Sequence, residues 1–373
     1  MRPIGHEIAC DQFRLPIESP KKAFKTSGPK LTVSTNGDNL SASSSKVNFV
    51  FNRKTGIVTS YKVDGTEYFS EGFGIQPNFW RAPTDNDYGN GMPKRLQVWK
   101  ESSKNFNVTD ATVTMDGNNA VVNVNYLLPA GNLYIVNYTI YPSGAVNVAA
   151  RFTSTDMDAA QTEVSEATRT ATFTPGRDAA RKEASKLNVP RIGVRFRLPA
   201  SMNQVEYFGR GPAENYLDRN AGSMVGLYKS TAEELYFPYV RPQENGHHTD
   251  TRWVSLSTGK KGLLIQADNT IGFNALRNSI EDFDDEEATG LSRQWSNFTP
   301  EQVANHDEAA AKNVLRRQHH INNITPRDFV EVCVDLKQQG VAGYDSWGSR
   351  PEPAYTLPAN REYNWGFTLI PLK

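Results

Sequence analysis

Three segments of the sequence combine polar side chains, aromatic rings and glycines. The first, NFWRAPTDNDYGNG at residues 78–91, has an aromatic pair followed by Asp85, Asn86 and Asp87 and then two glycines. Sugars require directional hydrogen bonds to their hydroxyl groups and an apolar surface against the ring. The same carboxylates are equally suited to capping a helix expected from Pro93 or to closing their own turn. The segment is therefore a candidate sugar-binding loop, with capping as its structural alternative.

A glycine-punctuated segment near the end of the chain, GVAGYDSWG at residues 340–348, carries Asp345 and Trp347. Glycine lets the backbone turn sharply, so these flanks favour a loop that displays the indole ring to a ligand. The structural alternative is a tryptophan buried in the core, in which case the domain would only buttress an oligomer. We expect Trp347 and residues 85–91 to project towards one shared cleft.

A second polar cluster is formed by Glu214, Glu244 and His247, which have the side chains needed for acid–base chemistry or metal ligation. Adjacent side chains on a strand point to opposite faces, so one of His247 and His248 at most joins a given site. The structural alternative is that nearby arginines pair with the glutamates. The cluster lies in two segments, YFGRGPAENYLDR at 207–219 and YVRPQENGHHTDTR at 239–252.

The overall charge is balanced, with 41 basic and 41 acidic residues, so no net field favours nucleic acid or an anionic membrane. The two cysteines, Cys10 and Cys333, are far apart and indicate neither a zinc site nor a disulfide framework. The opening residues lack the pattern of a signal peptide, and no stretch approaches the roughly 18 apolar residues of a transmembrane helix. We expect a soluble protein, cytoplasmic or periplasmic, with no metal site in this segment.

Short β-branched and aromatic runs separated by turn residues fill most of the chain from residue 31 onwards. Residues 47–51, a turn over 52–56, and residues 57–63 predict a hairpin. So many runs favour two large packed sheets over a small barrel. We therefore expect an all-β fold, a large antiparallel supersandwich. Further predicted strands lie at 111–115, 120–128, 133–141, 145–152, 192–198, 205–208, 253–258, 262–267, 329–336 and 363–371.

Helices are expected to be few and short. The best candidates are residues 93–103 and 301–315. Two polar stretches, 153–188 and 281–295, are predicted to be inserted surface loops, because neither carries a recognisable ligand-binding pattern.

The domain boundaries follow from composition. Residues 16–30 are rich in Pro, Ser and Lys and predict a linker, because they offer little apolar area to bury. Residues 1–15 then form the last strand of a preceding domain, and residues 31–373 form the main domain.

Together these segments resemble the small-chain region of the β-galactosidases of glycoside hydrolase family two. Four motifs follow one another in the order of that family: NFWRAPTDNDYGNG, YFGRGPAENYLDR, YVRPQENGHHTDTRW and GVAGYDSWG. They belong to a match over roughly residues 47–372, and four ordered motifs are far more specific than any one of them. The opening GHEIACDQFRL is similar to the final strand of the immunoglobulin-like domain that precedes this region. The resemblance implies a supersandwich of the galactose mutarotase-like type.

The resemblance also implies a function, the retaining hydrolysis of terminal β-D-galactosides such as lactose. In this family a TIM-barrel domain supplies both catalytic carboxylates, so this segment would contain no catalytic residue and be inactive alone. It would bind the β-galactoside and complete the active site on the aglycone side. The barrel is the expected partner, and a homo-oligomer is compatible with the family. Magnesium and sodium, where the full enzyme uses them, bind mainly to barrel residues, so no cofactor is expected here.

The resemblance assigns roles to a few residues. Trp347 matches the family tryptophan that stacks against sugar in the aglycone subsite. Residues 85–91 match a mobile loop at the pocket mouth, with Gly89 at its hinge. Asp345 and Ser346 are expected to hold the tryptophan loop in shape.

Two other functions remain open from the sequence. A stand-alone carbohydrate-binding module would use the same displayed aromatic residues. An aldose 1-epimerase would use Glu214, Glu244 and His247, although a shared fold does not by itself carry a shared reaction.

Overall fold

The computed structural model describes residues 10–17, 23–154, 187–284, 320–345 and 348–373. These residues form an all-β fold in which each pair of neighbouring strands is antiparallel, which confirms the expected class. The strands are β1 (Thr32–Asn36), β2 (Asn39–Ser43), β3 (Val47–Asn52), β4 (Ile57–Val63), β5 (Thr66–Glu67), β6 (Gln76–Asn78), β7 (Asn107–Asp116), β8 (Asn119–Leu127), β9 (Asn132–Ile140), β10 (Val146–Ser154), β11 (Arg191–Pro199), β12 (Gln204–Gly211), β13 (Met224–Thr231), β14 (His248–Ser257), β15 (Gly262–Leu276), β16 (Phe329–Gln338) and β17 (Tyr363–Leu372).

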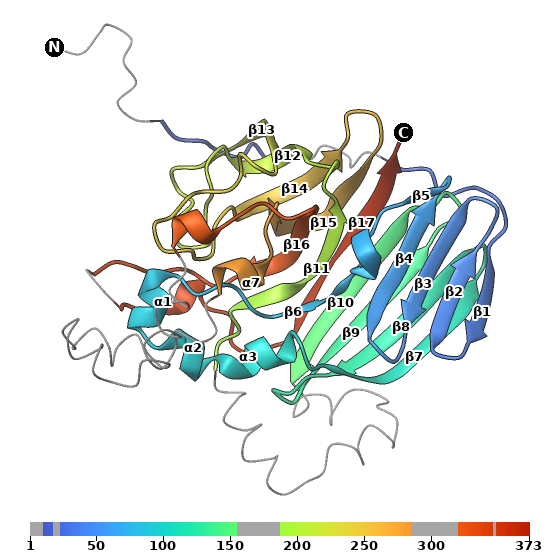
Figure 1. Cartoon of the computed structure of the whole chain (residues 1–373), viewed down its shortest axis with the longest axis horizontal. Coiled ribbons are helices and arrows are strands. Elements are labelled where there is room, and N and C mark those ends of the chain that lie inside the picture. Colours follow the sequence, from blue (N-terminus) through green and yellow to red (C-terminus); the bar gives the residue numbers. More distant parts are fainter. Residues whose placement is uncertain (1–9, 18–22, 155–186, 285–319, 346–347) are drawn as a thin grey trace, which may run out of the picture.

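The first sheet is a five-stranded meander in the order β1-β2-β3-β4-β5. Alternate residues of β3 are buried, which is the period-2 pattern of a strand with one covered face. Figure 1 shows this sheet lying over strands β7–β10 of the larger sheet. Between the sheets, the rings of Phe49 and Tyr138 lie 5.6 Å apart, and the Tyr61 hydroxyl donates to the Gly144 carbonyl at 2.6 Å. The two stacked sheets therefore share one aromatic core.

The second sheet has twelve strands and branches at β15. Its main path is β13-β12-β14-β15-β17-β10-β9-β8-β7. Residues 262–267 of β15 pair with β17, whereas residues 272–276 pair with β16. Residues 268–270, which lie between these two parts, are polar and exposed, so the strand changes partner at a polar break. The branch continues from β16 to β11 and then to β6.

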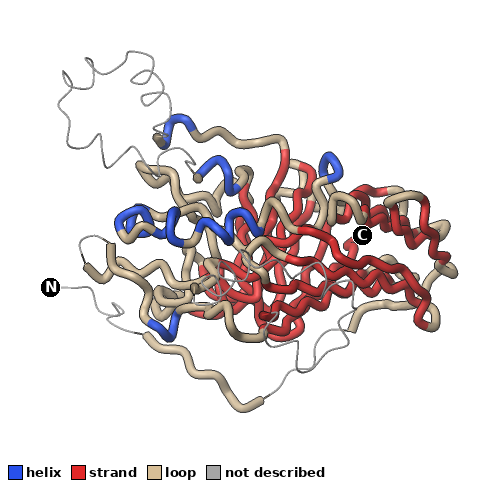
Figure 2. The backbone as a smooth tube through the Cα atoms, turned by 90° about the horizontal axis from the view of Figure 1, so that it is seen from below, coloured by secondary structure: helices blue, strands red, loops and turns tan. Residues whose placement is uncertain are grey.

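The helices are short, and most of them lie on the side of the molecule away from the five-stranded sheet (Figures 1 and 2). The expected helix over 93–103 is present in two pieces, α2 (Met92–Arg95) and α3 (Gln97–Ser102), which are separated at Leu96. Trp99 of α3 packs against Phe79, with ring centroids 6.4 Å apart, and this contact anchors the helices to the core. Two further helices were not expected, α1 (Asp85–Gly89) and α7 (Ile280–Phe283).

The N-terminal residues lie along the sheet edge. Residues 10–17 form no strand in this structure, so the assignment of residues 1–15 to a preceding domain stays a prediction. The side-chain amide of Gln12 binds both the N–H and the carbonyl of Val225 in β13, each at 2.7 Å. Phe24, within the predicted linker, packs edge-on against Tyr141 at 5.4 Å.

Several predictions fall outside the described residues. These are the helix at 301–315 and most of the two predicted insertions at 153–188 and 281–295. Among the described helices, none is both long and apolar enough to cross a bilayer.

Candidate substrate-binding site

The sheet topology brings two of the sequence motifs to the same edge. Strands β6 and β16 both pair antiparallel with β11, and Gly193 of β11 faces Asn78 on one side and Asp335 on the other. Because β6 and β16 therefore run in the same direction, the chain leaves both of them at the same edge. Residues 79–91 follow β6, and residues 339–349 follow β16. The two segments therefore begin at the same end of the sheet, on either side of β11.

Asn86 of α1 joins these two loops directly. Its side-chain N–H groups donate to the carbonyls of Val341 at 3.1 Å and Ser349 at 2.7 Å, and its side-chain oxygen accepts the N–H of Gly348 at 2.9 Å. Gly348 has φ +91°, and a Cβ there would lie 3.2 Å from the backbone of Gly89. One amide thus closes the base of the loop at 341–349, and glycine is required where the loops touch. Trp347 and Ser346 lie outside the described residues, so the placement of the indole stays a prediction.

Asp345 and Ser349 close the same loop upon itself. The Ser349 hydroxyl accepts the N–H groups of Gly343 at 3.0 Å and Tyr344 at 3.2 Å, while a carboxylate oxygen of Asp345 accepts the Ser349 N–H at 3.1 Å. These bonds constrain the segment on both sides of residues 346 and 347.

Asp87 is a buried ion-pair partner. Its side chain is 2% exposed and lies 2.9 Å from the guanidinium of Arg81, which is 0% exposed. It also accepts the N–H of Thr84 at 3.0 Å, and the Thr84 hydroxyl accepts the N–H of Asp87, so the pair forms the capping box of α1. Asp87 therefore caps its own short helix and not the one at Pro93. Contact between Asp87 and a sugar hydroxyl would require this pair to open.

Arg81 extends the same ion pair to the second loop. It donates to the carbonyls of Gln339 at 2.8 Å and Gly340 at 3.2 Å. In the sequence Arg81 stands out only as a neighbour of the aromatic pair, because nothing in the local sequence shows that these carbonyl acceptors lie more than 250 residues away.

Asp85 is exposed on the outer side of α1, with 64% of its side chain accessible. It pairs with Arg241 at 3.2 Å, and that guanidinium also lies 3.8 Å above the ring of Tyr88. The backbone N–H of Asp85 donates to the side chain of Gln243 at 2.8 Å. The motif at residues 239–252 therefore contacts the motif at residues 78–91. Asp85 nevertheless remains accessible to a ligand.

The second polar cluster separates into two networks. In the first, Glu214 accepts hydrogen bonds from the Tyr239 hydroxyl, from Arg219 at 3.3 Å and from the Gly246 N–H at 2.7 Å. Its pairing with Arg219 is the structural alternative considered above. These bonds use both carboxylate oxygens of Glu214 to hold two loops together.

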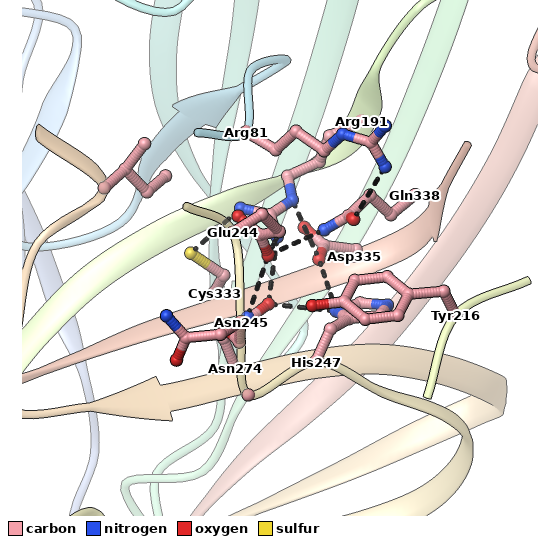
Figure 3. Close-up of polar contacts among 12 residues, drawn as sticks. Arg81, Arg191, Tyr216, Glu244, Asn245, His247, Asn274, Cys333, Asp335 and Gln338 are labelled. Carbon is pink, nitrogen blue, oxygen red and sulfur yellow. Dashed lines mark hydrogen bonds and ion pairs between the residues drawn. The ribbon is translucent and has the colours of Figure 1, made fainter. Parts of the chain in front are cut away.

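The other network is centred on Arg191, a buried residue that was not among the candidates. Arg191 donates to Glu244 and to the side-chain oxygen of Asn274, both at 2.9 Å, and lies 3.2 Å from Asp335 (Figure 3). Since the same Asn274 oxygen is 2.9 Å from Nδ1 of His247, that histidine nitrogen carries the proton. His248 instead packs on the rings of Tyr207 and Phe273, so the two histidines do reach different surroundings.

Burial controls the protonation of this second network. Burial lowers the pKa of His247 well below its usual range, and the nearby charge of Arg191 lowers it further. Burial also raises the pKa of Asp335 to about 7, with Glu244 adding to the effect and Arg191 opposing it. Neither oxygen of Asp335 accepts a hydrogen bond within the described part of the chain, so no hydrogen bond favours its charged form.

A small cavity of about 20 Å³, roughly the space of one water molecule, adjoins the network and is lined in part by Arg191, Glu244 and Asn274. Small-molecule sites usually measure about 300–1,000 Å³. The charged groups at this cavity are already paired with one another, so its geometry favours a structural role over catalysis. Among the described residues, no cluster of three or more His, Cys, Asp or Glu side chains is arranged to hold a metal.

Comparison with known proteins identifies the same family that the four sequence motifs resemble. The sequence model of the protein family described as the β-galactosidase small chain matches residues 43–369. The chain belongs to the β-galactosidase small-chain family. A β-galactosidase from Priestia megaterium is 31% identical over 371 residues, which are 99% of this chain and 30% of that protein. A β-galactosidase small subunit from Latilactobacillus sakei is 27% identical over 338 residues, covering 86% of this chain and 92% of the relative.

This chain spans 30% of the length of three curated β-galactosidases that it matches, from Priestia megaterium, Streptococcus thermophilus and Vibrio cholerae. Among solved structures, a galactose 1-epimerase from Lactobacillus acidophilus is similar over 92% of this chain, with a TM-score of 0.44 and 8% identity.

Proposed function

We propose that this chain is the non-catalytic C-terminal part of a retaining β-galactosidase and that it completes the active site on the aglycone side. The observation that carries the proposal is the set of three hydrogen bonds made by the Asn86 side chain, which join the loop at 341–349 to the segment at 85–91. The sequence predicts sugar binding for both segments. Their contact supports one shared binding surface.

The pairing of the carboxylates supports a catalytic site on another domain. Retaining glycosidases use two carboxyl groups about 5–5.5 Å apart, one of which attacks the sugar as a nucleophile. Glu214 and Glu244 are instead held by Arg219 and Arg191 and by further hydrogen bonds. A carboxylate whose oxygens are already engaged in ion pairs and hydrogen bonds is a poor nucleophile. We therefore assign both catalytic groups to a barrel domain, on the same polypeptide or on a separate large chain.

The surface offered to the substrate combines an exposed carboxylate and an exposed ring. Asp85 lies on the outer side of α1, and Tyr344, 55% exposed, lies in the loop that Asn86 closes. A carboxylate accepts from sugar hydroxyls, and a ring packs against the apolar face of a pyranose. Trp347 is proposed to add a second ring between the glycines of the same loop.

Reconstitution tests this proposal. The purified chain and the catalytic chain are assayed separately and together with nitrophenyl β-D-galactoside. We expect activity in the mixture and none in this chain alone. Hydrolysis by this chain alone would contradict the proposal. Calorimetry of the isolated chain with lactose covers the alternative, since millimolar binding that is lost in Trp347→Ala would support an independent binding module.

A further inference from the structure

Asp218, which was not a candidate site residue, binds the backbone of the loop at 341–349. It lies in the loop after β12 and reaches the start of the loop at 341–349. One carboxylate oxygen accepts the N–H of Val341 at 3.0 Å, and the other accepts the N–H of Ala342 at 2.7 Å. The Tyr344 hydroxyl lies 3.4 Å from the second oxygen. A single side chain from the second motif therefore holds the backbone of the fourth.

The backbone at this point has a conformation suited to an anion. Ala342 has φ +56°, in the left-handed region that residues other than glycine rarely adopt. A residue in this region can turn successive N–H groups towards one point, forming an anion-binding nest. Here the anion is the Asp218 carboxylate, which compensates for the unfavourable conformation of Ala342 with two charge-assisted hydrogen bonds.

The Asp218 carboxylate packs directly against Gly340. A Cβ placed on Gly340 would lie 2.4 Å from a carboxylate oxygen of Asp218. Within the described ranges, Asp218 forms no ion pair with a basic side chain, in contrast to Asp85 and Asp87, which pair with arginines. The hydrogen-bonding capacity of this half-buried carboxylate is thus directed to the loop.

Three side chains hold successive parts of the loop. Arg81 binds the carbonyls of residues 339 and 340, Asp218 binds the N–H groups of 341 and 342, and Asn86 binds the far end at 348 and 349. The Asp218 contact lies where the backbone turns away from the sheet edge. It therefore sets the direction in which the loop leaves.

We propose that Asp218 is a positioning residue for the aglycone site: by holding residues 341 and 342, it sets the direction of the next described residues, 343–345, and so the affinity for the part of a β-galactoside beyond the galactose ring. This rests on the proposed function. Recognition of the galactose ring itself is assigned to the catalytic domain and is independent of Asp218.

The test compares two substrates in the full enzyme, consisting of this chain with its catalytic partner. Asp218→Asn keeps the shape of the side chain but removes the charge and one acceptor. We expect KM for nitrophenyl β-D-galactoside to rise about tenfold, the loss of one charge-assisted hydrogen bond. For methyl β-D-galactoside, whose aglycone is one carbon, kcat/KM should change by less than about twofold. Asp110→Asn, an exposed residue of β7, is the matched control. Equal effects on both substrates, or no effect on either, would overturn the proposal.

A second measurement does not require activity. Amide hydrogen exchange of the isolated chain should become faster at residues 341–349 in Asp218→Asn, with unchanged protection in β8 and β9. Gly340→Ala, which places a methyl group against the carboxylate and keeps every charge, should have the same effect. Unchanged exchange at 341–349 in both variants would refute the positioning role. If the wild-type mixture fails to hydrolyse galactosides, the proposed function fails, and hydrogen exchange still decides whether Asp218 holds the loop.

Discussion

Removing the Asp87 carboxylate should strongly destabilise the domain. Asp87→Ala leaves Arg81 fully buried without its counter-charge, although the guanidinium keeps its contacts to Gln338, Gln339 and Gly340. Breaking a buried ion pair by removing one partner costs about 3–5 kcal/mol. The substitution also removes the capping contact to the Thr84 N–H, which adds about 1 kcal/mol. Since domains are stable by only about 5–15 kcal/mol, this is a large fraction of the total.

Asp85 provides a control on the same helix. Its pair with Arg241 is exposed, and such pairs contribute about 0.2–1 kcal/mol. Urea unfolding of the isolated chain, followed by tryptophan fluorescence, should show a large decrease in the midpoint for Asp87→Ala and a small one for Asp85→Ala. Equal losses in the two variants would refute the argument, because it depends on the difference in burial between two carboxylates on one turn of helix.

Three further predictions concern other parts of the domain. Because the pKa of Asp335 is raised to about 7, its contribution to stability is present below about pH 4 and is lost as the pH rises to 7. The difference in unfolding free energy between wild type and Asp335→Asn should therefore decline over that interval. A constant difference would contradict this prediction. Gly193→Ala should destabilise by about 1–3 kcal/mol, because its Cβ would lie 2.1 Å from Asp335, whereas Gly222→Ala, with open space around it, should change the unfolding free energy by less than about 0.5 kcal/mol. Since we assign magnesium and sodium to the catalytic domain, EDTA should leave the Tm of the isolated chain unchanged, and a decrease would indicate a metal site in this chain.

The strands could be predicted because most of them have one covered face. In β8 buried and half-buried residues alternate throughout, and this pattern is legible in the sequence. β6 could not be predicted in this way, since its three residues include a proline and are all buried. It exists through its pairing with β11, which lies over 110 residues away in the chain. The edge strand β13 was missed because none of its residues is buried and it lacks a covered face.

Helix α1 had a sequence signal that was overlooked. Thr84 followed by Asp87 at the third position is the spacing of a capping box, and the structure forms it. Gly89, which is the last residue of α1, Gly91 just beyond it and the lack of an apolar stripe favoured a loop instead. The predicted helix at 93–103 is divided because Leu96 takes a non-helical conformation between α2 and α3.

The positions of the candidate site segments could be expected, but their supporting contacts could not. The aromatic and glycine content of residues 85–91 and 340–348 identified two candidate segments, the first of which is largely helix α1, and the parallel direction of β6 and β16 places them together. Arg81, Arg191 and Asp218 were missed because each acts on residues that are distant in sequence. An arginine or aspartate in isolation gives no indication of its partner, so these roles depend on the fold.

The proposed function requires that the loop at 341–349 acts as part of a galactosidase active site. The most direct test is the KM for nitrophenyl β-D-galactoside in the reconstituted enzyme with wild-type chain and with Trp347→Ala. We predict a KM at least several-fold higher for the variant, with the two mixtures assembling equally well by size-exclusion chromatography. An identical KM at equal assembly would contradict the central claim.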